Sequence, residues 1–229
     1  MPNELIWVLF ALINFVMFTL MYKVFGKMGI FFWIVLATIL ANVQVVKIIP
    51  LFGLEASLGN ILYGTIFLGT DVLNEIYGKK DAKKAVYLGF IVLFIFLIVM
   101  QFALWFAPHI NDGAQTALET IFGFTPWIVL GSVTAFIVSQ MFDVYIFQWI
   151  KKKLPDNKYL WIRNNGSTIV SQLIDTLIFV PIAFLLSGYL PFESVVGVFI
   201  STYLIKLLVA VLDTPFIYLI KKVKPIELK

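Results

Sequence analysis

Seven ionisable side chains lie inside long apolar stretches of this 229-residue sequence: Lys47, Asp71, Glu75, Asp143, Asp175, Lys206 and Asp213. An ionised group at the centre of a membrane helix costs about 2.5–3.5 kcal/mol on the insertion scale. It is therefore retained where it has a partner, faces a polar interior or lines a wet cavity. Carboxylates in such a place can accept N–H groups or carry protons, and an ammonium can neutralise a carboxylate.

The expected depth of these residues separates them into groups. Asp71, Asp143 and Asp213 lie six or seven residues from one end of their stretches, which places three carboxyls at one level, roughly 10 Å inside. Asp175 and Lys206 are expected nearer the middle, and they would neutralise each other if their helices are neighbours.

The remaining two charges lie near the ends of their stretches. Glu75 stands four residues before Lys79, a spacing that favours a surface ion pair. Lys47 can extend its ammonium group to the interface. For Glu75, a structural and a functional role both stay open.

Polar residues recur at helical spacing around the deeper charges. Thr168, Ser171, Gln172, Asp175 and Thr176 follow the i, i+3, i+4, i+7, i+8 pattern and share one helix face. Comparable sets are Ser132, Ser139, Gln140 and Asp143; Thr202, Lys206 and Asp213; Asp71, Asn74 and Glu75; and Thr38 with Asn42 beside Gln44 with Lys47. These faces are expected to meet in a common interior, although hydrogen bonding between helices explains some of the serines and threonines.

The composition requires a membrane as the solvent around these elements. Hydrophobic residues make up 61% of the chain and charged residues 13%, against roughly 45–50% and about 25% in soluble domains. A water-soluble globule is therefore excluded. Zero Cys and one His exclude disulfides, thiolate or histidine metal clusters and cysteine nucleophiles, so we expect no cofactor, no metal and no enzyme activity.

Seven apolar stretches of about 20 residues predict an all-α polytopic membrane protein, a bundle of seven transmembrane helices. The stretches are Leu5–Tyr22, Ile30–Ile49, Leu58–Tyr77, Ala85–Phe106, Trp127–Ile150, Gly166–Leu186 and Val195–Ile220. We also expect a short interfacial helix at Ala114–Phe122. We divide the chain into an additional N-terminal helix and linker (residues 1–29), a six-helix unit (residues 30–222) and a cytoplasmic tail (residues 223–229).

The basic residues predict the orientation of this bundle. Fifteen of the 17 Lys and Arg residues follow the first, third, fifth and seventh stretches, including Arg163 and the terminal Lys229. Basic loops stay in the cytoplasm, so the N-terminus is expected outside and the C-terminus inside. The net charge of +4 is then a cytoplasmic rim beside membrane lipid, and no nucleic acid partner is expected.

A ten-residue pattern occurs twice in the chain. Val138–Phe147 and Val170–Phe179 are identical at six of ten positions. Their helices run in opposite directions in the predicted topology, as in transporters built from inverted repeats, whose sites lie near the midplane. Pro181 and Pro215 are expected to loosen the helices beside Asp175 and Asp213.

The residue types in the predicted interior favour a flat polar ring as ligand. Asn and Gln amides both donate and accept, a carboxylate accepts from adjacent N–H groups, and aromatic faces stack on rings. A guanine-like edge satisfies such a set. This chemistry does not select one compound.

The order of these motifs resembles the bacterial and archaeal queuosine precursor transporters, also called the vitamin uptake transporter family. The resemblance covers roughly residues 30–222. It rests on Thr70-Asp71-x-x-Asn74-Glu75-x-Tyr77-Gly78 before the basic Lys79–Lys84 segment, Gln140-x-x-Asp143-Val144, Ser167-Thr168, Ser171-Gln172-x-x-Asp175-Thr176 with Phe179, and Lys206 before Asp213 and Pro215.

The resemblance implies an inner-membrane importer of a 7-deazaguanine such as 7-cyano-7-deazaguanine, working without ATP hydrolysis. For the mechanism, we expect alternating access around a midplane site. Candidate substrate-binding residues are then Asn42, Gln44, Asp71, Gln140, Asp143, Gln172, Asp175, Thr176 and Lys206. Candidate coupling or gating residues are Asp71, Asp143, Asp213 and Glu75, with a proton as the candidate coupling ion. The sequence leaves open whether the chain forms a homodimer.

Two other functions compete with this one. A substrate-binding subunit of an energy-coupling-factor transporter would need a face of regularly spaced alanines, and Ala37 and Ala41 have that spacing. A microbial rhodopsin would carry retinal on Lys206, but Thr202 stands where that family usually has Asp. A colourless purified protein would exclude the second alternative.

Overall fold

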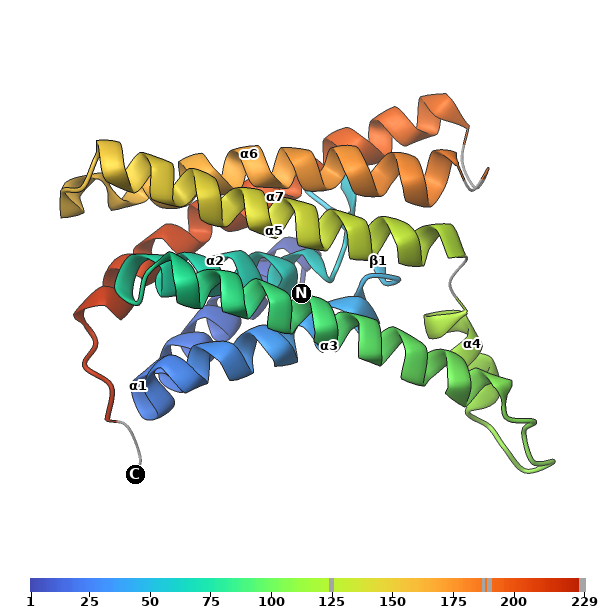
Figure 1. Ribbon diagram of the computed structural model, residues 1–229. Helices are drawn as coiled ribbons and strands as arrows, with labels where there is room; N and C mark the ends of the chain where they lie inside the picture. The colour runs from blue at the N-terminus through green and yellow to red at the C-terminus, as the bar shows by residue number, and fades with distance from the viewer. Residues whose placement is uncertain (124–125, 187, 189–190, 227–229) are drawn as a thin grey trace.

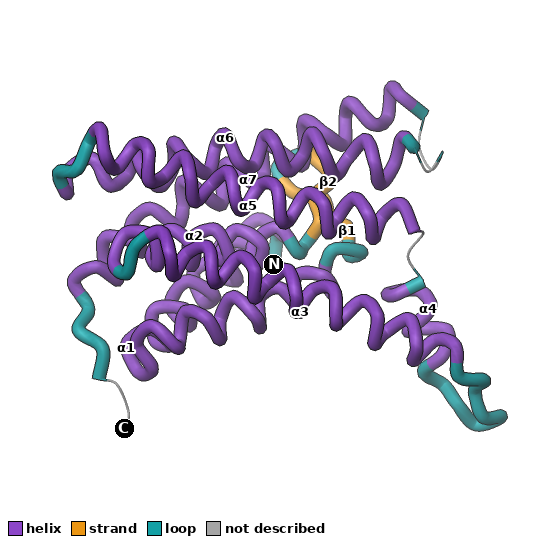
Figure 2. Tube along the Cα trace, in the orientation of Figure 1, coloured by secondary structure: helices purple, strands orange, loops and turns teal. Residues whose placement is uncertain are grey.

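The computed structural model describes residues 1–123, 126–186, 188 and 191–226 and is almost entirely helical (Figures 1 and 2). The elements are α1 (Asn3–Gln44), β1 (Ile48–Leu51), β2 (Leu54–Ser57), α2 (Asn60–Ile76), α3 (Lys79–Trp105), α4 (Gln115–Phe122), α5 (Pro126–Lys153), a 3₁₀ turn (Asn157–Tyr159), α6 (Leu160–Val180), a π-helical turn (Pro181–Leu185) and α7 (Phe192–Lys222).

Helix α1 contains the first two predicted spans as two antiparallel arms, residues 3–25 and 27–44. Gly26 joins the arms with φ 55° and ψ −136°, a conformation that a residue with a Cβ adopts at a cost. The rings of Phe18 and Trp33 lie 5.9 Å apart, whereas a straight helix would separate these positions by about 22 Å. The chain therefore folds back at Gly26, as Figure 1 shows at the lower left.

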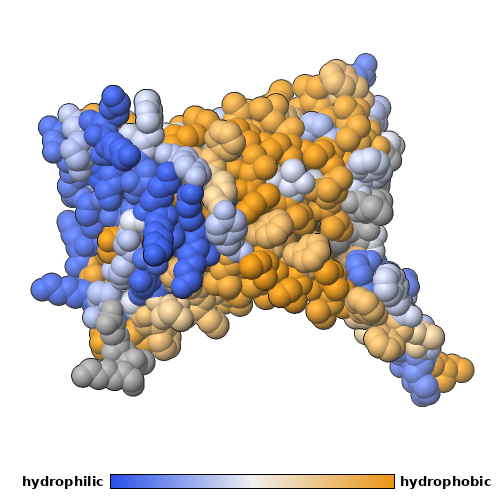
Figure 3. Space-filling view, viewed as in Figure 1, coloured by the Kyte–Doolittle hydropathy of each residue, from blue (hydrophilic) through white to orange (hydrophobic). Residues whose placement is uncertain are grey.

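Five helices of the described chain are long and apolar enough to cross a membrane: α1, α3, α5, residues 157–185 and α7. The shorter α2 covers the third predicted span with 17 residues. Their exposed surfaces carry Leu, Ile, Val and Phe side chains, which form a broad hydrophobic band in Figure 3. The predicted helical membrane protein and the predicted short helix, found at Gln115–Phe122, are thus confirmed.

Several predicted boundaries are wrong. The second span ends at Gln44, and a β-hairpin follows in which Ile48 pairs with Ser57. Lys47 consequently lies outside the helices and is exposed. Helix α6 begins at Leu160, six residues before the predicted start, so Arg163 is not a loop residue but is buried inside the bundle. Additional turns of helix form because these residues find partners in the interior.

The two prolines behave differently. Pro181 begins a π-helical turn at the end of α6, as predicted from its missing N–H group. Pro215 lies inside α7, which continues to Lys222. Since proline has no N–H, one backbone hydrogen bond is missing at Pro215, but α7 does not end there.

The described basic segments gather at one end of the bundle, which we call the basic end. Lys27 pairs with Asp81 across 3.4 Å, and the backbone of Ile226 bonds to that of Lys23. The hydrophilic surface at the left of Figure 3 marks this end. The opposite half contains the β-hairpin, where the amide of Asn3 donates to Pro50; we call it the hairpin end. Lys229 lies outside the described residues.

Candidate functional site

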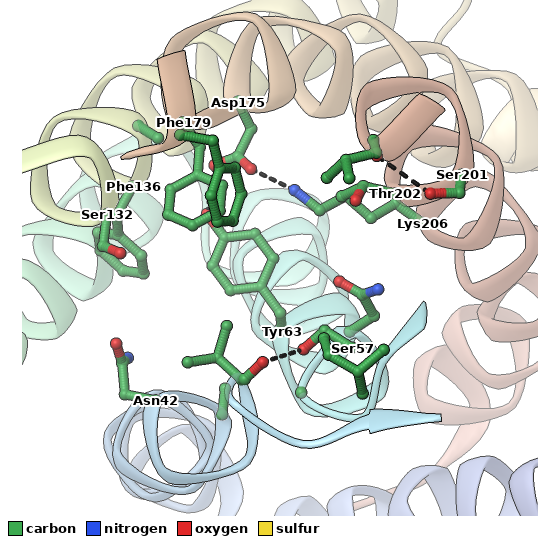
Figure 4. Close-up of a pocket in the computed structure, with 18 of the residues that line it drawn as sticks. Asn42, Ser57, Tyr63, Ser132, Phe136, Asp175, Phe179, Ser201, Thr202 and Lys206 are labelled. Carbon is green, nitrogen blue, oxygen red and sulfur yellow. Dashed lines mark hydrogen bonds and ion pairs between the residues drawn. The ribbon is translucent and has the colours of Figure 1, made fainter. Parts of the chain in front are cut away.

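A cavity of about 340 Å³ lies inside the hairpin-end half of the bundle. Residues of α1, the β-hairpin, α2, α3, α5, α6, the π-helical turn and α7 line it. Figure 4 shows side chains from these elements pointing toward one another around this space. Its volume falls at the lower end of the range for small-molecule sites. The helices are held together by an apolar core, and three of its residues, Ala41, Leu93 and Phe136, also line the cavity.

Asp175, Lys206, Tyr63 and Ser139 form one polar unit beside the cavity, which we call the Asp175 cluster. The Asp175 carboxylate accepts hydrogen bonds from the Tyr63 hydroxyl at 2.6 Å and the Ser139 hydroxyl at 3.1 Å. The Lys206 ammonium pairs with its other oxygen, as the dashed line in Figure 4 shows. The predicted neutralisation of Asp175 by Lys206 is confirmed, because α6 and α7 are neighbours.

This cluster offers free hydrogen-bonding capacity to a ligand. An ammonium has three donors and a carboxylate about four acceptor sites, so neither Lys206 nor Asp175 is saturated by the bonds just described. Lys206 lies 5.0 Å from the centre of the Tyr63 ring. The aromatic rings of Phe136 and Phe179 also line the cavity. A planar heterocycle with adjacent donors and acceptors fits these groups.

A second polar unit, the Asp143 cluster, lies nearer the basic end and does not line the cavity. It comprises Asp71, Asp143 and Asp213 with their hydrogen-bond donors. Ser171 donates to Asp143 at 2.8 Å, Asn164 to Asp213 at 2.7 Å, and Thr168 to Asp71 at 3.5 Å. The three carboxyls, at most 1% exposed, interact electrostatically. The depth argument therefore correctly grouped them.

The two clusters are linked by a reciprocal pair of hydrogen bonds between the ten-residue repeats. Ser139 of α5 donates to Asp175 of α6, while Ser171 of α6 donates to Asp143 of α5. Helices α5 and α6 run antiparallel side by side (Figure 1). Since the Ser and Asp of each repeat are four residues apart, an approximate two-fold axis between the helices exchanges the two bonds. This is the geometry expected of an inverted repeat.

A third charged unit, the Glu75 node, closes the bundle at the basic end. The Glu75 carboxylate contacts Arg163 at 2.9 Å, Lys151 at 3.2 Å and Lys221. Arg163 also donates to the carbonyl oxygens of Leu154 and Asp156. Glu75 thus joins α2 to α5, α6 and α7, so the proposed surface pair with Lys79 is wrong. The reason is that the Arg163 side chain points into the bundle, where it pairs with Glu75.

Only some of the predicted substrate-binding residues line the cavity. Asn42, Asp175 and Lys206 line the cavity. The side chains of Asp71, Gln140, Asp143, Gln172 and Thr176 are buried between the helices on the same polar faces, as the helical periodicity predicted, but they are not part of its wall. Gln44 lies at the end of α1 and is not part of the wall either.

The predicted set omitted several residues that line the cavity. Tyr63 and Asn60 stand eight and eleven residues before Asp71 in α2, on the same helix face. Periodicity from Asp71 could have found both. Phe136, Phe179 and Phe184 look like ordinary membrane residues in a sequence, and only their placement beside the cavity distinguishes them.

A family model described as "Putative vitamin uptake transporter" matches residues 57–220. A curated protein of Bacillus subtilis (strain 168), "Probable queuosine precursor transporter", is 53% identical over 225 residues, which is 98% of this chain and 97% of the relative. The chain belongs to the vitamin uptake transporter family. It is therefore a membrane protein of a transporter family and not an enzyme.

More distant members of the family show the same relationship. The "Queuosine precursor transporter" of Escherichia coli (strain K12) is 24% identical over 163 residues, 71% of this chain and 70% of the relative. A "Probable queuosine precursor transporter" of Haemophilus influenzae is 30% identical over 135 residues, 58% of this chain and 54% of the relative. No solved structure matches the chain.

Family membership and structure together weaken both alternative functions. Ala37 and Ala41, the candidate docking face for an energy-coupling partner, are at most 5% exposed and face the bundle interior. Lys206, the candidate retinal attachment site, is ion-paired with Asp175.

Proposed function

We propose that this protein imports a queuosine precursor, 7-cyano-7-deazaguanine or a related 7-deazaguanine, by alternating access around the cavity. The observation that carries the proposal is the pairing of Asp175 and Lys206 beside Tyr63 at the edge of the cavity. The names of the relatives in Bacillus subtilis and Escherichia coli support the choice of substrate.

The chemistry of the base matches the groups around the cavity. A 7-deazaguanine presents a ring N–H next to an amino group on one edge, with a carbonyl oxygen beside them. The remaining acceptor capacity of Asp175 suits the N–H groups, and the unused donors of Lys206 suit the carbonyl. Tyr63, Phe136 and Phe179 supply ring faces for stacking.

We further propose that the hairpin end faces outward and the basic end faces the cytoplasm. The concentration of Lys residues at the basic end supports this orientation. The cavity would then open outward, and the Glu75 node would close the cytoplasmic side.

A proton is the coupling ion we propose, held between Asp71 and Asp143. One oxygen of each carboxyl is buried without a hydrogen-bond partner among the described residues. A single shared proton would supply a donor between two groups that otherwise repel each other.

The decisive experiment expresses the chain in a host that lacks both precursor synthesis and its own importer. We expect queuosine to return to the host tRNA when 7-cyano-7-deazaguanine is supplied at low concentration. Asp175→Asn should abolish this rescue, whereas Glu119→Gln, a change on the exposed helix α4, should not. Wild-type protein that inserts normally but gives no rescue with any 7-deazaguanine would contradict the proposed substrate.

A further inference from the structure

Several of the buried polar groups that have no hydrogen-bond partner lie on the basic side of the cavity. Among the described residues they include Gln140 Nε2, Gln172 Oε1 and Asn164 Oδ1, next to the Asp71 and Asp143 oxygens that would share the proposed proton. All five side chains are at most 1% exposed. Packed interiors rarely leave such groups unpaired. Their concentration between α2, α5 and α6 points to a molecule that occupies this region in another state.

The reciprocal bonds of the repeats show which groups correspond. The two-fold exchange that carries Ser139 and Asp175 onto Ser171 and Asp143 also relates Gln140 to Gln172, the next residue of each repeat. Helices α2 and α7 serve both clusters. Tyr63 and Lys206 reach Asp175, while Asp71 and Asp213 interact with Asp143. The Asp143 cluster is therefore the counterpart of a cluster that already faces a cavity.

We propose that the Asp143 cluster is a second binding station for the transported heterocycle, occupied after the basic end opens. This inference rests on the proposed function, because it takes the same substrate class. In a transporter built from inverted repeats, access alternates between the two sides when the two repeats exchange their conformations. The basic end of the bundle, which covers Asp143 in this structure, would then open, while the cavity beside Asp175 closes.

The two stations differ in the charge of their side chains. Lys206 accompanies Asp175, whereas acids accompany Asp143. The second station thus offers carboxylate and amide oxygens to the N–H edge of the base. Those N–H groups compete with the proposed proton between Asp71 and Asp143 for the same oxygens. Arrival of the base would release that proton to water at the basic end.

The Glu75 node is the gate that this scheme requires. It lies between the Asp143 cluster and the basic end, and its ion pairs join Glu75 on α2 to Lys151 on α5, Arg163 on α6 and Lys221 on α7. The helices that supply the second station cannot separate at the basic end while these pairs are intact. Weakening the node should therefore expose the Asp143 cluster to water.

The absence of Cys from the sequence allows a direct test of this exposure. Ser167 is fully buried on α6, one helical turn from both Asn164 and Ser171. We would introduce Ser167→Cys as a reporter and measure its modification by a membrane-impermeant maleimide in purified proteoliposomes. Adding Glu75→Gln should increase the labelling rate at least about tenfold, the change expected if the open population rises tenfold.

A milder variant and a control protect the test against misfolding. Lys221→Met removes one ion pair from a half-exposed residue and should raise labelling in the same direction. Glu119→Gln should leave the rate unchanged. A reporter at Ser132→Cys, on the cavity wall, should be labelled more slowly in the Glu75→Gln protein, because the cavity closes when the basic end opens. Unchanged labelling of Ser167→Cys in both node variants would overturn the gate and the second station.

Binding and transport measurements then separate the stations. Asp143→Asn should leave the affinity for 7-cyano-7-deazaguanine from the hairpin side within about threefold but reduce uptake at least tenfold. Asp175→Asn should reduce both the affinity for 7-cyano-7-deazaguanine and the uptake. Equal loss of affinity in the two variants would contradict separate stations. Because maleimide labelling needs no ligand, it can succeed even if the proposed substrate is wrong.

Discussion

Asp143 and Asp175 occupy the same position in two copies of one ten-residue pattern, yet their neighbours differ. Each accepts a hydrogen bond from the serine of the other repeat. Asp175 is neutralised by Lys206, whereas Asp143 faces other acids. A single sequence pattern has therefore produced two sites of different electrostatic character, because α2 and α7 present different side chains at the two levels.

The Asp175–Lys206 pair is expected to contribute both to the stability of the fold and to transport. Asp175→Asn or Lys206→Met alone leaves a buried charge unpaired, which destabilises a protein by about 3–5 kcal/mol. The double variant Asp175→Asn/Lys206→Met should recover most of this loss in thermal unfolding, yet it should not transport. Asp156→Asn, at an exposed pair with Lys158, is the matched control and should change neither quantity. A double variant that transports normally would contradict the role of the pair in binding.

Gln172 provides a second test at this scale. Its Oε1 atom is buried without a partner among the described residues, so Gln172→Met removes an unsatisfied group while nearly conserving volume. We expect thermal stability that is equal to or higher than that of the wild type, together with slower uptake. A stability loss above about 2 kcal/mol would show that the amide has an essential structural bond.

At the scale of elements, the reversal inside α1 positions the first arm against the rest of the bundle. Phe15 of this arm packs against Phe216 of α7, with ring centres 4.8 Å apart, and Trp7 packs against Phe52 of the hairpin. The opposite face of the arm carries exposed apolar residues. The arm thus lies at the periphery of the bundle.

Gly29 makes this reversal possible. A Cβ at Gly29 would lie 2.1 Å from the carbonyl oxygen of Met21, and the backbone would have to move. We expect Gly29→Ala to lower the melting temperature and increase proteolysis near residue 26. Gly113→Ala, where a Cβ meets nothing within 4 Å, should have no effect. Equal melting temperatures for both variants would argue against a close approach of the arms.

At the scale of the whole molecule, the charges outside the bundle interior are divided between its ends. Described basic segments from four parts of the chain meet at one end, and the β-hairpin, whose residues Ile48, Glu55 and Ser57 line the cavity, lies toward the other. The Glu75 node and the cavity therefore stand at opposite ends of one polar column through the bundle.

The orientation can be tested in intact cells with the Cys-free chain. Lys158→Cys, at the basic end, should react with an impermeant maleimide only after the cells are lysed. Asp112→Cys, in the exposed loop before α4, should react in intact cells. The reverse result would invert the orientation and assign the present cavity to the cytoplasm.

Helical periodicity and charge counting determined the helices, their polar faces and the grouping of Asp71, Asp143 and Asp213, because these depend on local spacing and depth. They could not place Arg163 or partner Glu75 correctly, since a basic residue at a helix end is compatible with either water or an interior carboxylate. The reciprocal serine–aspartate bonds, the separation of the cavity from the Asp143 cluster, and the contribution of Phe136 and Phe184 to the cavity were decided by tertiary packing. Those features depend on which helices are neighbours and at what height they meet, and residue spacing along one chain contains no measure of either.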